Sequence, residues 1–184
     1  AQVTEDRLVA CLSQAASDPA AALVTANEWL LENSSIDQSA ARQCLGMAHV
    51  AQRQFLAAET AFARAAADSV REAGGHQARS ADLLAQAGNA ALVDNRAADA
   101  LRHFEEALQI PGLNDFSQGE LRLDRARALV LAGRSGEARA DLELAHSLVP
   151  DDPLGWLLSA TLARRESRLD DAARDIDVAA RLAP

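Results

Sequence analysis

A short apolar pattern recurs four times in this chain and restricts its fold more than any other feature. Each copy has an alanine, a large apolar residue four positions later and a second alanine three positions after that: Ala58, Phe62, Ala65; Ala100, Phe104, Ala107; Ala138, Leu142, Ala145; Ala172, Ile176, Ala179. Spacings of three and four residues place these side chains on one face of a helix. The leading alanines are 42, 38 and 34 residues apart. A recurrence at this spacing predicts stacked helical units.

The remaining sequence is also helical in character. Gly and Pro are few, at 9 and 5 residues, and between them apolar residues recur every three or four positions. No segment predicts a strand. We expect ten helices joined in pairs by short turns, at about residues 4–16, 19–32, 35–53, from 55 to past 68, 78–93, 97–110, 117–133, 135–150, from 153 onward, and 170–182.

Helix-start signals support several of these boundaries. An Asp-Pro pair can cap a helix while Pro occupies the first turn, where its missing N–H costs nothing, and Ser followed three residues later by Gln or Glu is a capping box. These signals occur at Asp18-Pro19, Asp152-Pro153, Ser35 with Gln38, and Ser117 with Glu120. The predicted breaks are Asn33-Ser34-Ser35, Gly74-Gly75 and segment 111–116.

The aligned copies resemble the tetratricopeptide repeat (TPR) family, whose unit is a helix–turn–helix of about 34 residues. The family's small residue at the close contact between two helices is matched by Gly46, Gly88, Ala126 and Ala160. Its Leu-Gly pair, its tryptophan and its terminal proline are matched by Leu45-Gly46, Trp156, Pro150 and Pro184. Its tyrosine is absent, and the corresponding positions are His49, Ala91, Leu129 and Ala163.

The resemblance covers about residues 35–184 and implies an all-α fold, a right-handed superhelix (solenoid) of about five antiparallel hairpins. We expect a single domain over residues 1–184, with repeats at 34–73, 74–116, 117–150 and 151–184. The segment 1–33 is expected to be a degenerate pair that covers one end, since Trp29 stands where a small residue is expected.

The charge balance bears on the class of partner. The chain has 27 acidic and 18 basic residues, a net charge of −9, which argues against a nucleic acid or an anionic membrane surface as its ligand. No apolar run reaches the roughly 20 residues that span a bilayer. We therefore expect no nucleic-acid binding and no membrane insertion. All 18 basic residues are Arg, a composition typical of GC-rich, bacterial coding.

No motif predicts catalysis, a metal or a cofactor. Cys11 and Cys44 lack CxxC spacing and are predicted to be small buried thiols, without a disulfide framework or a zinc site. Cys44 and His49 are five residues apart on one predicted helix, which turns them to different faces and disfavours a nucleophile–base pair. The other histidines, His76, His103 and His146, have no partner at metal-ligand spacing. We expect a protein that is not an enzyme.

The resemblance implies that the first helices of the hairpins line a concave groove that binds partners. The predicted partner-binding residues are Gln43, Met47, Asp82, Asn89, Arg127, Thr161, Arg164 and Arg165, with Val50, Leu92, Leu123, Val130 and Leu157 as apolar ground. The two-carboxylate clamp found in part of the family is not predicted, because its positions carry mostly Gln43, Met47, Gln86, Glu120 and Asp124.

Two functions remain open. The first is a non-catalytic scaffold for protein–protein interaction that holds a partner peptide or helix in the groove. The second is an assembly module that self-associates, as a homo-oligomer, or docks end-on in a larger complex, because Ile176 or its neighbours on the last helix have no predicted cover. The chain begins at Ala1-Gln2, which is compatible with signal-peptide removal and an exported or periplasmic location, or with trimming and a cytoplasmic one.

Overall fold

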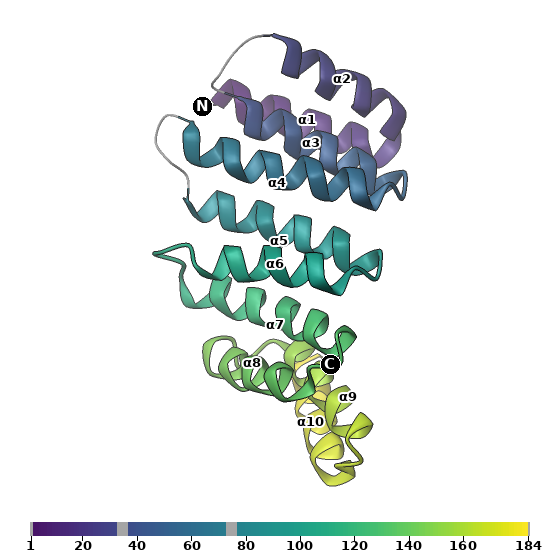
Figure 1. Ribbon diagram of the computed structural model, residues 1–184, viewed down its shortest axis with the longest axis vertical. Coiled ribbons are helices and arrows are strands. Elements are labelled where there is room, and N and C mark those ends of the chain that lie inside the picture. The colour runs from purple at the N-terminus through teal and green to yellow at the C-terminus, as the bar shows by residue number, and fades with distance from the viewer. Residues whose placement is uncertain (1, 33–36, 73–76, 184) are drawn as a thin grey trace. The chain divides into compact units, whose positions relative to one another are not determined.

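The structure, a computed structural model, describes residues 2–32, 37–72 and 77–183, and every regular element in these ranges is an α-helix (Figure 1). The helices are α1 (Gln2–Ser17), α2 (Pro19–Leu31), α3 (Gln38–Ala51), α4 (Phe55–Arg71), α5 (Gln77–Val93), α6 (Ala97–Leu108), α7 (Asp115–Leu131), α8 (Ser135–Leu148), α9 (Pro153–Arg165) and α10 (Leu169–Leu182). The predicted all-α class is confirmed. The predicted breaks at 33–35 and 74–75, together with Ser35, His76 and Pro184, lie outside the described residues.

The helix caps agree with the sequence in two places and differ in one. The Asp18 carboxylate accepts a hydrogen bond from the Ala21 backbone N–H, and the Asp152 carboxylate accepts one from the Leu154 N–H. The predicted cap at Ser117 is wrong. Asn114 caps α7, because its side-chain oxygen accepts the Ser117 N–H at 2.8 Å, and the helix therefore begins two residues earlier than expected.

The chain divides into two compact units, Ala1–Pro111 with α1 to α6 and Gly112–Pro184 with α7 to α10. In the first unit α2 packs on α3, and α3 to α6 pack each on the next (Figure 1). In the second unit α7 packs on α8 and on α9, and α9 packs on α10. The single domain over residues 1–184 stays a prediction.

The turns that join the helices of the last four hairpins share one backbone conformation. At each turn one residue adopts a positive φ, and these residues are Arg53, Asn95, Gly133 and Ser167. The N–H of this residue donates to the carbonyl three residues before it, and the N–H of the following residue donates to the carbonyl five residues before that one. In the first of these turns, Arg53 N–H donates to Val50 O and Gln54 N–H donates to His49 O, both at 2.9 Å. This is the Schellman arrangement that ends many helices. It gives the four hairpins the same turn although their turn residues differ.

In the first two of these hairpins, a glycine on the first helix faces a phenylalanine ring on the second. A Cβ added to Gly46 would lie 2.5 Å from the Phe62 ring, and one added to Gly88 would lie 2.5 Å from the Phe104 ring. Both rings are fully buried. The equivalent pairs in the other two hairpins are Ala126 with Leu142 and Ala160 with Ile176. The absence of a Cβ therefore makes room for the phenyl ring, and a Cβ is present where the opposite side chain is aliphatic.

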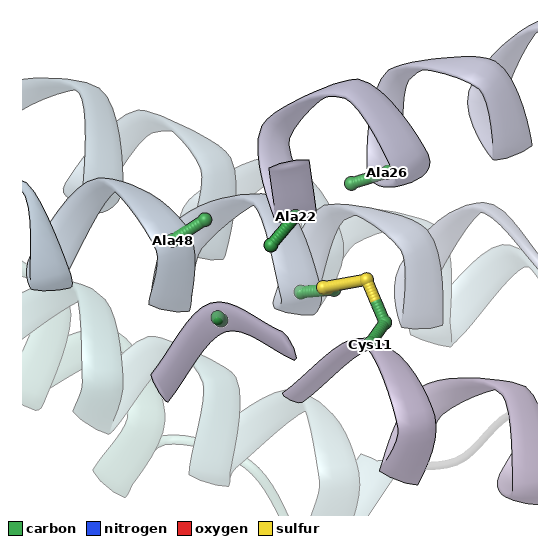
Figure 2. Close-up of a cluster of buried hydrophobic side chains, with 6 residues drawn as sticks. Cys11, Ala22, Ala26 and Ala48 are labelled. Carbon is green, nitrogen blue, oxygen red and sulfur yellow. A yellow bond between two sulfur atoms is a disulfide. The ribbon is translucent and has the colours of Figure 1, made fainter. Parts of the chain in front are cut away.

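The two cysteines form a disulfide, and the prediction of separate buried thiols is therefore wrong. Cys11 on α1 and Cys44 on α3 are bonded, with their Cα atoms 5.9 Å apart, and both are buried. Figure 2 shows the sulfur–sulfur bond beside Ala22, Ala26 and Ala48, whose small side chains leave space for it. The sequence could not reveal this bond, since the cysteines are 33 residues apart. Their proximity depends on how α1 packs against α3.

The N-terminal pair is anchored by Trp29, which is 1% exposed in a cluster with Ala40 and Ala41 of α3. The Arg7 guanidinium lies 4.4 Å from the centre of the Trp29 ring and donates two hydrogen bonds to the Glu32 carboxylate. Trp29 thus packs α2 against α3 through a large side chain, at a position where the later hairpins carry alanine. No helix in the described ranges has the length and apolar character needed to cross a membrane.

Candidate functional site

The eight predicted groove residues all lie on first helices of hairpins, from α3 to α9. Six are exposed and two are half-buried: exposed are Met47, Asp82, Arg127, Thr161, Arg164 and Arg165, and half-buried are Gln43 and Asn89. The residues on α3 and α5 belong to the first compact unit, and those on α7 and α9 belong to the second.

In the first unit, a hydrogen bond joins the two first helices. Arg79 on α5 donates to the Gln43 side-chain oxygen on α3 at 2.7 Å. Desolvation raises the pKa of the Asp82 carboxyl, and the positive charge of Arg79 opposes that rise. Met47 on α3 is 39% exposed and adds a flexible apolar side chain to this surface.

In the second unit, three of the predicted residues meet at one hollow of about 170 Å³, which we call the α7–α9 hollow. Its polar rim consists of Arg127 from α7 with Thr161 and Arg165 from α9. Its apolar walls are Ala126, Val130, Leu142, Leu158 and Leu162. Small-molecule sites usually occupy about 300–1,000 Å³, so this hollow is suited to a single side chain of a larger partner.

The polar groups on the rim are partly engaged within the chain. The Arg127 guanidinium donates to the Asp124 carboxylate at 2.9 Å, and the Thr161 hydroxyl donates to the Leu157 carbonyl at 2.8 Å. Arg165 is exposed and makes no ion pair with any residue in the described ranges. Guanidinium groups bind carboxylates through paired, charge-assisted hydrogen bonds. The rim can therefore hold a carboxylate while the walls receive an aliphatic group.

Two other residues that were predicted to lie on the groove surface, Arg164 and Leu123, do not line the α7–α9 hollow. Arg164 is exposed, but its side chain does not line the hollow. Leu123 is only 1% exposed, so the prediction that it lies on the groove surface is wrong. One of its methyl groups lies 3.2 Å from where a Cβ of Gly155 would be, so Leu123 packs between α7 and α9.

A second hollow, of about 680 Å³, was not predicted and lies on α3, α4 and the turn between them, with Asp94 from the turn after α5 at its edge. We call it the arginine hollow, and its charged and apolar lining includes Arg42, Arg53, Arg64, His49 and Leu56. No sequence motif marked it. The structure shows that Arg53 occupies a turn position where the later hairpins have Asn95, Gly133 and Ser167. No group of three or more His, Cys, Asp or Glu in the described residues is arranged to hold a metal ion.

Comparison with known proteins identifies the fold. MamA (MSR-1) superposes with a TM-score of 0.66 at 17% identity, covering 99% of this chain and 97% of that one. A MamA RS-1 double mutant gives 0.74 at 14% identity, covering 98% and 93%. YrrB, a TPR protein with an unusual peptide-binding site, gives 0.67 at 17% identity, covering 91% and 79%. The chain has the tetratricopeptide repeat fold.

The tetratricopeptide resemblance that the repeated positions indicated is confirmed by these structural matches. No protein-family profile matches the chain, and no curated protein matches it. In the TPR fold, helices that differ in sequence keep the same hairpin because a few contact positions and the turn conformation are preserved. Here those positions are the Gly or Ala of the first helix and the large apolar residue that faces it.

Proposed function

We propose that this chain is a non-catalytic protein–protein interaction module that holds a partner peptide or helix against its first-helix surface. The observation that carries the proposal is the α7–α9 hollow, where Arg127, Thr161 and Arg165 converge from two helices around apolar walls. Binding surfaces with an apolar centre and a polar rim are typical of protein interfaces. The peptide-binding site of YrrB, which has the same fold, supports this class of function.

The partner segment is expected to place an aliphatic side chain in the hollow and a carboxylate near Arg165. The volume of about 170 Å³ accommodates one such side chain, and burial of an aliphatic side chain contributes roughly 1.5–3 kcal/mol. The carboxylate would bind Arg165, whose charge has no acidic partner in the described part of the chain.

The test begins with random 12-residue peptides displayed on phage and selected on the full chain. Enriched peptides are then measured by fluorescence anisotropy. Arg165→Glu is expected to weaken their binding at least about tenfold, because it replaces a charge-assisted hydrogen bond by repulsion. Arg127→Glu is expected to act in the same direction, while circular dichroism keeps the wild-type helical signal.

Arg164→Glu is the matched control for Arg165→Glu. Both residues lie in the last turn of α9, so both changes lose the same favourable interaction with the helix dipole, but only Arg165 lines the hollow. Binding that falls equally in both variants would show a general charge effect. Peptides that bind all variants as they bind the wild type would exclude the α7–α9 hollow as the site.

Self-association is the second candidate function, and α10 supports it. Ile176 on α10 is 50% exposed, whereas the equivalent Phe62 and Phe104 are buried. Leu169, also on α10, is 65% exposed. An apolar helix face of this kind is suited to pack against a second copy or another chain.

Multi-angle light scattering should then show a mass that increases with concentration, and Ile176→Asp should return it to the monomer mass. A constant monomer mass up to millimolar concentration would exclude self-association.

A further inference from the structure

The arginine hollow contains two arginines that lack an acidic partner. Arg64 on α4 and Arg53 make no ion pair with any residue in the described ranges. The guanidinium carbon of Arg53 lies 5.8 Å from the centre of the Phe55 ring. The third arginine, Arg42, is bound to Asp68 at 2.7 Å.

The other polar groups of the hollow do not neutralise these two charges. Asp94 is the one acidic residue in the lining, and it accepts a hydrogen bond from Arg96 at 2.9 Å. His49 pairs through its Nδ1 with the Gln54 side-chain oxygen at 2.7 Å. The hollow is therefore a cationic region on a chain whose net charge is −9, and oppositely charged groups will be attracted to it.

The backbone conformation of Arg53 also suggests that this side chain is present for the hollow and not for the turn. Arg53 has φ of 59°, in the left-handed region that non-glycine residues seldom adopt. Gly133 occupies the equivalent turn with φ of 76° and carries no Cβ penalty there. An arginine at this turn is not explained by the turn itself, since glycine fits it better. Its guanidinium contributes to the hollow instead.

We infer that the arginine hollow docks an acidic segment of a partner protein, with carboxylates on Arg53 and Arg64 and an apolar side chain on Leu56. Leu56 is 62% exposed and lies in the same lining. The volume of about 680 Å³ exceeds that of one side chain and admits several residues of a segment. This surface is on α3 and α4, separate from the residues of the α7–α9 hollow, and the inference does not depend on the function proposed for that hollow.

Fluorescence anisotropy on the full chain tests this inference with three labelled probes. They are a 12-residue peptide of four Glu-Asp-Leu repeats, the same peptide with Lys in place of each acid, and a single-stranded DNA of 12 nucleotides. The acidic peptide is expected to bind, to weaken as salt rises from 50 to 200 mM, and to lose about tenfold in affinity in both Arg53→Gly and Arg64→Gln.

Two controls separate the hollow from general effects. Ser167→Gly makes the same backbone change at the equivalent turn of another hairpin, and Arg181→Gln removes an exposed arginine on α10 that has no ion pair among the described residues. Both are expected to bind the acidic peptide as the wild type does. The inference is overturned if the acidic peptide does not bind, if the lysine peptide or the DNA binds as tightly, or if the Arg53 and Arg64 variants match the controls. It is also overturned if Arg165→Glu, rather than these variants, abolishes binding.

Discussion

Replacing both cysteines, in a Cys11→Ala/Cys44→Ala variant, should lower the free energy of unfolding by about 4 kcal/mol. The disulfide closes a loop between residues 33 apart in sequence, and a cross-link of that length removes about this much chain entropy from the unfolded state. It also ties α1, which belongs to the divergent N-terminal pair, to α3 of the next hairpin. Urea unfolding followed by circular dichroism measures the change.

A reductant provides the control for the disulfide. Dithiothreitol should shift the unfolding midpoint of the wild type towards that of the double variant and leave the double variant unchanged. A thiol assay on unfolded wild-type chain should detect no free thiol before reduction and two after it. A wild-type midpoint that does not respond to reduction would show that the bond contributes nothing to stability.

The same bond supports an oxidising compartment for this chain. Disulfides persist in secreted and periplasmic proteins and are uncommon in the cytosol. We therefore favour the exported or periplasmic location among those open from the sequence. Alkylation of thiols in intact cells before purification should leave Cys11 and Cys44 unlabelled, whereas labelling of both would place the chain in a reducing compartment.

Gly88→Ala should lower the free energy of unfolding by about 1–3 kcal/mol, although alanine is the better helix former. The new Cβ would lie 2.5 Å from Cε1 of Phe104, and the Phe104 ring is 0% exposed, so it cannot turn away into solvent. Helices α5 and α6 would have to separate or the ring would have to leave its rotamer. Urea unfolding of the variant beside the wild type measures the loss.

Two further variants make this prediction specific. Gly136→Ala is the matched control, because a Cβ there meets no atom within 4 Å, and it should leave stability unchanged or raise it by up to about 1 kcal/mol. Gly88→Ala/Phe104→Leu copies the pair formed by Ala126 and Leu142 and should recover at least half of the lost stability. Full stability in Gly88→Ala alone would mean that the two helices are not in close contact at this point.

The helices and their pairing could be predicted from the sequence because their causes are local. Apolar spacing at three and four residues selects the helix, and Asp18 and Asp152 cap the following helices with their own side chains. The one wrong cap shows the limit of such signals. Asn114 and Ser117 are both suitable cap residues, and the path of the loop before α7 decides between them.

The candidate sites depended on packing and were predicted only in part. Helical spacing placed Arg127, Thr161 and Arg165 on first helices, but the rotation of α9 against α7 decided that Arg165 lines the hollow and Arg164 does not. The arginine hollow was missed for the same reason, since Arg53 lies in the turn before α4 and Arg64 lies nine residues into α4. Neither residue is part of a recognisable motif.

The sequence by itself determined the repeated helical hairpin, because helix formation, capping and the Gly–Phe contact follow from residues within about 16 positions of each other. Only the tertiary structure decided that Cys11 bonds Cys44, that Leu123 is buried, and which arginines share a hollow. These facts depend on the rotation and tilt of one helix against another. Those quantities are set by the summed packing of many side chains and leave no signal at any single position.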